Sequence, residues 1–135
     1  MAIDKVFGPV DVAVSGMEAQ NKNLAAIYSN VANARTTDAG GQPYRRIEAI
    51  FKPQDSHDPL GGVMVDKIAQ DNSPFPELFD PTHPNADANG YVKMPNVSLP
   101  AEMINLTIAT RAYQANAAIL KRYQQIVDTA LELLR

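Results

Sequence analysis

The prolines divide this chain of 135 residues into three parts. Of the ten prolines, only Pro9 lies outside the window from Pro43 to Pro100. Most of the glycines also fall in or beside this window. A helix does not continue through such residues, because proline lacks the backbone N–H and its ring clashes with the preceding turn. We therefore expect one long helix on each side of an irregular middle segment.

The segment before the window has side chains suited to helix packing at alternating spacings of three and four residues. This spacing is the a/d seam of a left-handed coiled coil. Pro9 suits the first turn of a helix that runs from about Pro9 to Ala34. The outer face carries few charges, which is typical of a helix surrounded by other helices. The seam consists of Phe7, Val10, Val14, Met17, Asn21, Leu24, Tyr28 and Val31.

The segment from about Ala101 to Arg135 contains neither glycine nor proline and carries two apolar stripes. One partner helix covers one stripe, so the N-terminal helix leaves the other for a partner from another chain. The alternative is that the middle segment folds back over it. The first stripe contains Met103, Leu106, Thr110, Tyr113, Ala117, Leu120, Gln124, Val127, Leu131 and Leu134, and the second contains Ile108, Ala112, Ala115, Ile119, Tyr123, Ile126, Ala130 and Leu133.

The middle segment, about Thr36 to Pro100, is predicted to hold loops and short strands. Arg46–Lys52 and Val63–Ala69 are strand candidates, with Ile47, Ala49 and Phe51 expected on one face of the former. A third short strand, Tyr91–Met94, follows the turn signal Asn89-Gly90, and the run from Ser73 to Pro84 is expected to be extended and irregular. So few strands cannot form a core alone and must pack on a helix.

Composition excludes several classes of protein. The net charge is −3, which gives no footprint for nucleic acid or an anionic membrane surface. There is no cysteine, so disulfides and thiolate chemistry are excluded. The N-terminal residues do not have the pattern of a Sec-type signal peptide, and no stretch approaches the roughly 20 apolar residues of a membrane-spanning helix. We expect neither membrane insertion nor a small-molecule substrate.

The recognisable catalytic patterns are missing. There is no Gly-rich phosphate loop, no His-Glu-x-x-His and no Gly-x-Ser-x-Gly. Asp80, His83 and Asp87 form a thin ligand set for a metal, and we favour turns in which Asp and Asn side chains cap backbone groups. The cluster Asp55-Ser56-His57-Asp58 lacks the geometry of a catalytic triad, because adjacent residues rarely orient one another. We expect no enzymatic activity, no metal and no cofactor.

Four ordered motifs carry a resemblance to a known family. Ser29–Ala34 ends the first helix, and Gly41–Arg46 precedes the first strand. Asp80–Val92 leads into Pro95–Val97, and Arg111–Asn116 lies in the last helix. Together they resemble the bacterial flagellar rod and hook proteins, and in order and length the proximal rod subunits. One departure is Pro100, which could shift the start of the last helix by a turn. The motif residues singled out are Asn30, Asn33, Asp80, Pro81, Asp87, Gly90, Tyr91, Arg111, Tyr113 and Asn116.

The resemblance implies a mainly α fold in which the N- and C-terminal helices pair as an antiparallel coiled coil, with a small central β/loop segment. The expected divisions are 1–35 and 101–135, which together form an inner-tube domain, and the middle segment 36–100. Asn30 and Asn33 are expected to fix the turn that leaves the first helix, or simply to cap it. The expected subunit-interface residues are Val10, Val14, Met17, Leu24, Tyr28, Val31, Leu106, Tyr113, Ile119, Leu120, Ile126 and Val127.

The resemblance further implies a structural subunit that assembles helically into a drive shaft around an export channel. The implied partners are other rod proteins, copies of this chain and the export-gate adaptor at the rod base. The implied location is the periplasmic part of the basal body, reached through the flagellar type III export apparatus. Two alternatives stay open: another tube-forming secreted or phage-like axial protein, and a small soluble binding module.

Overall fold

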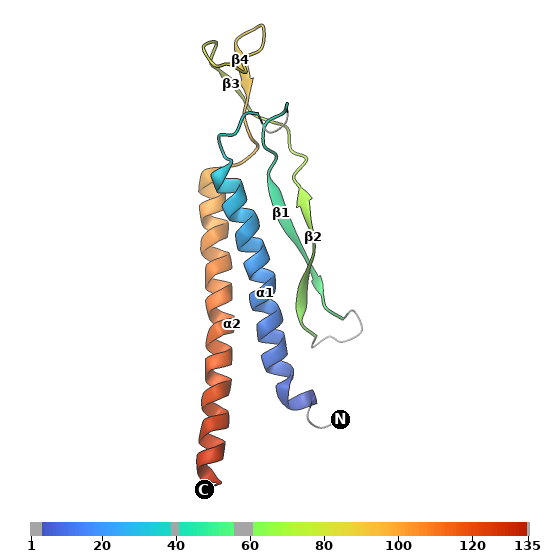
Figure 1. The fold of residues 1–135 in the computed structure, drawn as a ribbon, viewed down its shortest axis with the longest axis vertical. Coiled ribbons are helices and arrows are strands. Elements are labelled where there is room, and N and C mark those ends of the chain that lie inside the picture. The colour runs from blue at the N-terminus through green and yellow to red at the C-terminus, as the bar shows by residue number, and fades with distance from the viewer. Residues whose placement is uncertain (1–3, 39–40, 56–60, 135) are drawn as a thin grey trace.

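The computed structural model describes residues 4–38, 41–55 and 61–134. It contains two long helices, α1 (Asp4–Ala32) and α2 (Leu99–Leu133), with four strands between them along the chain. The helices lie side by side and antiparallel, so the end of α1 and the start of α2 meet at one end of the molecule (Figure 1). The strands form two antiparallel pairs, β1 (Ile47–Pro53) with β2 (Val63–Gln70) and β3 (Glu77–Phe79) with β4 (Tyr91–Lys93). This confirms the mainly α class with a small central β segment.

Both helices begin earlier than the sequence predicts. Pro9 lies inside α1 rather than in its first turn. A proline at that position removes one intrahelical hydrogen bond, and the first turn of α1 is set at an angle to the rest of the helix (Figure 1). In α2, Pro100 lies within the first turn, where its missing N–H costs nothing. The departure from the family pattern at Pro100 is therefore accommodated by the helix itself.

The β1–β2 hairpin packs along α1 and is held to it at two points. Asn30 bonds to Ile47 at the start of β1, and the hydroxyl of Ser15 accepts a hydrogen bond from the N–H of Val63 at the start of β2 (3.1 Å). About 22 Å of helix separate Ser15 from Asn30, and a strand of seven residues such as β1 spans about 23 Å. The matched lengths let the hairpin run beside the helix. A Cβ on Gly62 would lie 2.3 Å from the Ser15 hydroxyl, so only glycine permits this approach.

The two strand predictions for this hairpin are confirmed, with one local correction. Residues Ile47 and Ala49 are half-buried, whereas Phe51 is exposed. The pairing register shifts between Ile50 and Phe51, so that Phe51 pairs with Val65. A bulge of this kind breaks the two-residue alternation on which the prediction for Phe51 rested. The segment expected to be irregular also contains a strand, β3, which the sequence analysis missed.

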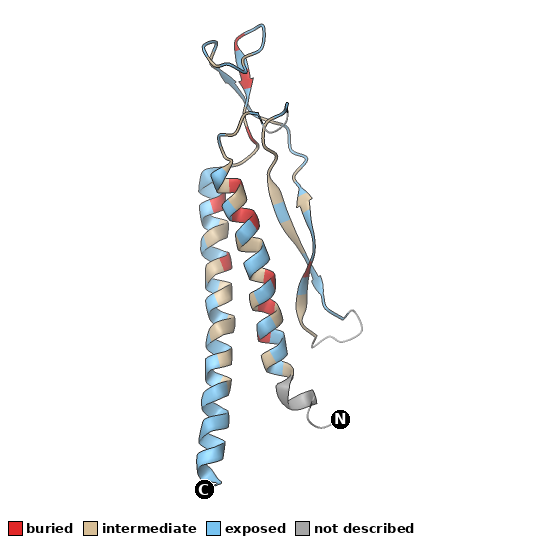
Figure 2. Cartoon of the chain, viewed as in Figure 1, coloured by how far each residue is buried: buried red, intermediate tan, exposed pale blue. Residues whose placement is uncertain are grey.

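The buried apolar residues are few and small, and they lie mainly on one side of α1 (Figure 2). The two helices are in close contact at Gly16, where an added Cβ would lie 2.6 Å from the amide nitrogen of Asn116. Large side chains of the predicted α1 seam are not buried there: Val14 and Tyr28 stay exposed. The buried hydrophobic residues are Ala13, Ala19, Ala26, Ile27, Val65, Val92 and Ala109.

The second apolar stripe of α2 is largely uncovered within the described residues. Leu106, Tyr113 and Leu120 of the first stripe are half-buried, but Ile119 and Ile126 of the second are exposed. The β1–β2 hairpin packs on α1, and no described strand packs on α2. The alternative in which the middle segment covers this stripe therefore does not hold at Ile119 and Ile126, which stay exposed.

Burial decreases along both helices away from the end where α1 ends and α2 begins (Figure 2). We expect amide hydrogen exchange of the purified chain to follow the same gradient, because local stability tracks buried contacts. Residues 20–32 and 102–113 should exchange slowly, whereas 8–14 and 120–133 should exchange fast. Hydrogen exchange with mass spectrometry measures this directly. Equal protection along the whole of α2 would contradict the expectation.

Candidate functional site

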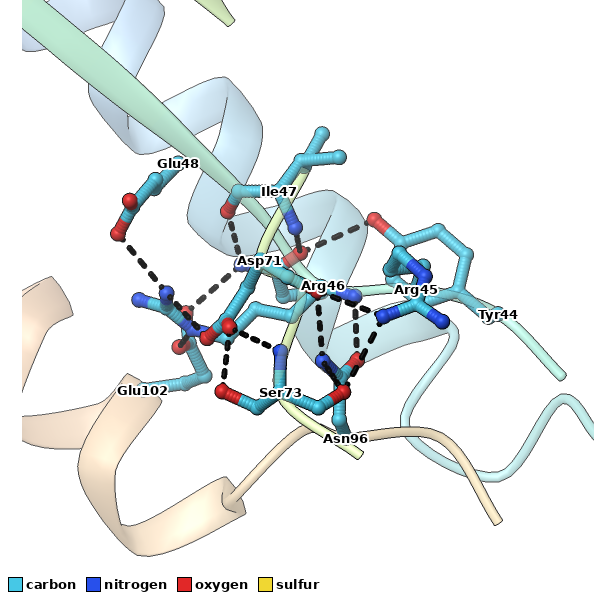
Figure 3. Close-up of polar contacts among 10 residues, drawn as sticks. Tyr44, Arg45, Arg46, Ile47, Glu48, Asp71, Ser73, Asn96 and Glu102 are labelled. Atoms are coloured by element: carbon cyan, nitrogen blue, oxygen red, sulfur yellow. Dashed lines mark hydrogen bonds and ion pairs between the residues drawn. The ribbon is translucent and has the colours of Figure 1, made fainter. Parts of the chain in front are cut away.

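The strongest polar cluster of the described residues lies where α1, α2 and β1 meet (Figure 3). We call it the junction and define it by Asn30, Arg46, Asp71, Asn96 and Glu102. It joins the two helices to the first pair of strands. Its contacts therefore fix the position of the first pair of strands relative to the two helices.

Asn30 is 1% exposed and has all four of its amide hydrogen-bonding positions occupied. Its Oδ1 accepts from the N–H of Ile47 (2.9 Å) and from the Tyr44 hydroxyl (3.0 Å). Its Nδ2 donates to the C=O of Ile47 (2.8 Å) and to Glu102 Oε2 (3.1 Å). The side-chain amide thus pairs with Ile47 as a neighbouring strand would, while it also reaches the first turn of α2.

Glu102 is fully buried, and its charge is compensated by Arg46. Arg46 Nε lies 2.7 Å from Glu102 Oε1, and Arg46 Nη1 lies 3.1 Å from Glu48 and 3.5 Å from Asp71. A buried carboxylate without a partner is expensive, so this ion pair is required for α2 to begin at this place. Burial alone would lower the pKa of the Arg46 guanidinium, but the hydrogen bonds and charges of Glu102 and Glu48 raise that pKa above its ordinary value.

A second layer of hydrogen bonds closes the junction on the side of residues 71–73 (Figure 3). Asn96 accepts from the N–H of Arg46 (2.8 Å) and donates to the C=O of Asp71 (3.0 Å). Arg45 Nη1 donates to the same C=O (2.9 Å), and its guanidinium lies 4.2 Å from the centre of the Phe75 ring. The segment that leaves β2 is thereby tied to the segment that enters α2.

The sequence analysis found only part of this junction. It singled out Asn30 for the turn after α1, but Asn30 instead bridges three segments. Asn33 does cap the helix, because its Nδ2 donates to the C=O of Ser29 (2.9 Å) and Thr36 donates to its Oδ1. Arg46 and Glu102 could not be paired from sequence, since they lie 56 residues apart. Arg46 lies at the end of the motif Gly41–Arg46, whereas Glu102 is an acidic residue in the first turn of α2 that belongs to none of the four motifs.

The side chains of the motif residues Asp80 and Asp87 cap backbone groups in turns. The sequence analysis favoured this role for the segment. Asp80 Oδ1 accepts from the N–H and hydroxyl of Thr82, which holds the pKa of the Asp80 carboxyl below its usual range. Asp87 Oδ1 accepts from the N–H groups of Asn89 and Tyr91. Among the described residues, no group of three or more His, Cys, Asp and Glu is placed to hold a metal ion. The cluster Asp55-Ser56-His57-Asp58 lies mostly outside them.

None of the expected interface residues is fully buried in the single chain. Of the motif residues on α2, Arg111 is exposed, Tyr113 is half-buried and Asn116 lies at the helix seam beside Gly16. Five interface residues are exposed and the rest are half-buried. The exposed set is Val14, Tyr28, Ile119, Ile126 and Val127, and the half-buried set is Val10, Met17, Leu24, Val31, Leu106, Tyr113 and Leu120.

Two long terminal helices that leave large apolar side chains such as Ile119 and Ile126 exposed are typical of a subunit of a larger assembly. Within the described residues, no helix is both long enough and apolar enough to cross a membrane. Residues 88–133 match the family described as flagellar basal body rod FlgEFG protein C-terminal. The junction residues Asn96 and Glu102 fall within this match.

Curated relatives match over nearly the whole chain. The flagellar basal-body rod protein FlgC of Salmonella typhimurium is 39% identical, with 98% of each chain covered. The FlgC proteins of Agrobacterium fabrum and Borreliella burgdorferi are 35% and 34% identical, over 98% and 96% of this chain and 98% of each relative. The chain belongs to the FlgC family of flagellar basal-body rod proteins. This confirms the expected family, the structural role in the rod and the location in the basal body.

Replacing Asn30 with alanine should lower the free energy of unfolding by about 3 kcal/mol, because it leaves the buried N–H and C=O of Ile47 and the Glu102 carboxylate short of partners. Asn33→Ala is the matched control from the same motif. It loses only a helix cap and should cost about 1 kcal/mol. Urea denaturation of the purified variants measures both values. Equal losses of unfolding free energy in the two variants would contradict the role of Asn30 in joining α1, β1 and α2.

The junction should weaken in acid through Asp71. Hydrogen bonds from the Ser73 hydroxyl and N–H, with the charge of Arg46, hold the pKa of the Asp71 carboxyl below its ordinary 3.8. A carboxyl with a lowered folded pKa stabilises the fold above its unfolded pKa and loses that contribution as the pH falls through the folded value. Denaturation at pH values from 7 to below 3.8 should show this loss in the acid part of the range, and Asp71→Asn should flatten it. Identical pH profiles would rule this role out.

Proposed function

We propose that this chain is a non-catalytic subunit of the proximal rod. In this proposal it assembles helically with copies of itself and with other rod proteins, encloses the export channel and transmits motor torque. Residues 1–35 and 101–135 form the inner-tube domain, and 36–100 form the outer brace. The observation that carries the proposal is the long apolar surface of the two helices, which stays uncovered in the single chain.

The amount of exposed surface supports an obligate assembly. A compact monomer of 14.7 kDa exposes about 6,900 Å². This chain exposes 9694 Å². The excess is about 2,800 Å², which lies in the range of obligate interfaces. A chain whose own core consists largely of alanines needs such contacts for its stability.

The predicted coiled-coil seams fit contacts between subunits better than the contact within one chain. Within the chain, Gly16 of α1 lies against Asn116 of α2, and most of the buried apolar residues are alanines. The larger a/d residues of α1 and the second stripe of α2 remain available to neighbouring helices. Knobs-into-holes packing in these seams would resist sliding and rotation, as a torque-bearing shaft requires.

The junction supports the mechanical part of the proposal. It fixes the β1–β2 hairpin to both helices through Asn30, Arg46 and Glu102. A brace tied in this way moves with the helices instead of swinging on a free linker. Export through the type III apparatus and contact with the export-gate adaptor at the rod base follow from the same proposal.

Ile119→Asp tests the proposal. Ile119 is 49% exposed, so the lone chain should tolerate the change, whereas a charge buried in an intersubunit seam should block assembly. We expect loss of swimming when the variant replaces the native chain, with unchanged hydrogen exchange of the purified monomer. Leu120→Asp should also abolish swimming.

The matched control is Gln125→Asp, another exposed position on α2, which should leave swimming close to that of the native chain. Normal swimming of both the Ile119 and the Leu120 variant would refute burial of these stripes in the rod.

A further inference from the structure

We propose that the groove beside β1 binds an extended segment of a different protein of the basal body, which adds to β1 as a further strand. We call this groove the strand site. This inference rests on the proposed function and deepens it, because it names one contact between the chain and another subunit. The strand site is lined by Gln20, Asn23, Ile27, Arg46, Ile47, Glu48, Ala49, Phe51, Asn105, Ile108 and Ala109.

The backbone of β1 has a free edge on the side of this groove. The C=O of Arg46 accepts a hydrogen bond from the N–H of Asp71 (2.8 Å), on the side of β2. The N–H and C=O of Ile47 both bond to Asn30, so they face the opposite side. Residues of an antiparallel strand alternate in this way. Ala49 lies two residues further on, before the shift in register, so it presents its N–H and C=O to the strand site.

Asn30 already occupies the first position of an added strand. Its side-chain amide both donates to and accepts from the backbone of Ile47, as a neighbouring strand would. The amide ends there, and the edge continues at Ala49. An unpaired strand edge is a template for an extended chain, and main-chain hydrogen bonds then provide the affinity.

The shape of the strand site fits one extended chain. Helix α1 lies between α2 and the β1–β2 hairpin, so α1 forms the floor of the groove, and β1 and α2 form its walls (Figure 1). The volume is about 310 Å³. The buried residues Ile27 and Ala109 give the groove an apolar base, and Ile108 on the α2 wall is 61% exposed.

The polar residues of the strand site match a peptide backbone. Gln20, Asn23 and Asn105 are half-buried carboxamides, which both donate and accept hydrogen bonds. Asn23 Nδ2 donates to Gln20 Oε1 (3.2 Å), so within the described part of the chain the Asn23 acceptor and the Gln20 donors are available. The charged lining residues Arg46 and Glu48 pair with each other at 3.1 Å. Neutral amides beside a strand edge complement backbone N–H and C=O groups rather than an ion.

The described residues of a second copy offer no suitable segment. Because α2 closes the far side of the groove, the site admits a single extended chain and not one edge of a paired hairpin. Residues 71–76 are the longest described segment without regular structure or turns. The C=O groups of Asp71 and Ser73 in that segment already accept from Arg45 and Asn96. The occupant is therefore an extended segment of another protein.

The contact is small, so it depends on the assembly. A strand beside Ala49 makes few backbone hydrogen bonds and buries far less than the roughly 800 Å² per partner of a stable interface. Neighbouring subunits that are already packed raise the effective concentration of such a segment. We therefore expect the strand site to be filled in the basal body and empty in the purified chain.

Photocrosslinking in the assembled basal body tests the proposal. Cells lacking the native chain would express the chain with p-benzoyl-phenylalanine in place of Ile108, and purified basal bodies would be irradiated and the crosslinked peptides sequenced by mass spectrometry. We expect a crosslink to a segment of a different protein. Ala49→Pro should abolish it, because proline lacks the N–H that an added strand needs, while the bonds of β1 to β2 remain.

Ile68→Pro is the matched control. Ile68 pairs with Ala49 across the hairpin, so its N–H also faces away from the partner strand, and this variant should retain the crosslink. Asn105→Leu is a second variant that leaves the backbone of β1 unchanged and should lower the crosslink yield. Hydrogen exchange of each purified variant checks that the hairpin stays folded.

A crosslink to another copy of this chain would overturn the proposal. So would a crosslink that persists in both the Ala49 and the Asn105 variant, or basal bodies that contain the labelled chain without any crosslink. Absence of the native chain itself from purified basal bodies would instead refute the proposed function. The two failures are therefore distinguishable.

Discussion

The side-chain amide of Asn30 is the contact on which the arrangement of the other elements depends. It supplies a donor and an acceptor to the backbone of Ile47 and a donor to Glu102, so it joins residues that lie 17 and 72 positions away in the sequence. In a buried site, each unsatisfied partner would cost about 1–3 kcal/mol. The bonds therefore select one position for β1 beside α1 and one for the start of α2.

Many of the large apolar side chains on the two helices remain exposed in this arrangement. The buried apolar residues are largely alanines, which bury little area, while Ile119 and Ile126 stay exposed. Apolar burial contributes roughly 25 cal/mol per Å², so most of the available hydrophobic free energy is gained only when neighbours cover the helices. The polar junction fixes the first pair of strands to the two helices, and in the proposed assembly the neighbouring subunits would add much of the stability.

The sequence predicted those elements that depend on local chemistry. Proline placement and helical periodicity located both helices, and alternation located β1, β2 and β4. The caps at Asp80 and Asp87 followed from turn chemistry alone. The bulge at Phe51 and the strand β3 were missed, because they depend on pairing with segments distant in sequence.

The helix seam was harder to predict for a related reason. Periodicity favours the stripe with the largest apolar residues, but the chain buries the neighbouring stripe of small residues around Gly16. Periodicity in one sequence does not distinguish an apolar stripe that packs on the chain's other helix from one that packs on a neighbouring subunit. The pairing of Arg46 with Glu102 could not be predicted either, since both residue types are common on solvated surfaces.

The use of arginine at position 46 follows from geometry. Its Nε bonds to Glu102 while Nη1 reaches Glu48 and Asp71, so one planar group contacts carboxylates from α2, β1 and the end of β2. A lysine ammonium also has three donors, but it lacks the planar guanidinium and therefore does not fix their directions relative to one another. A buried ion pair adds little net stability compared with apolar residues, but it is specific in direction. In a rod, directional contacts at the junction would give every copy the same offset between hairpin and helices, so that the outward stripes of successive copies lie in register.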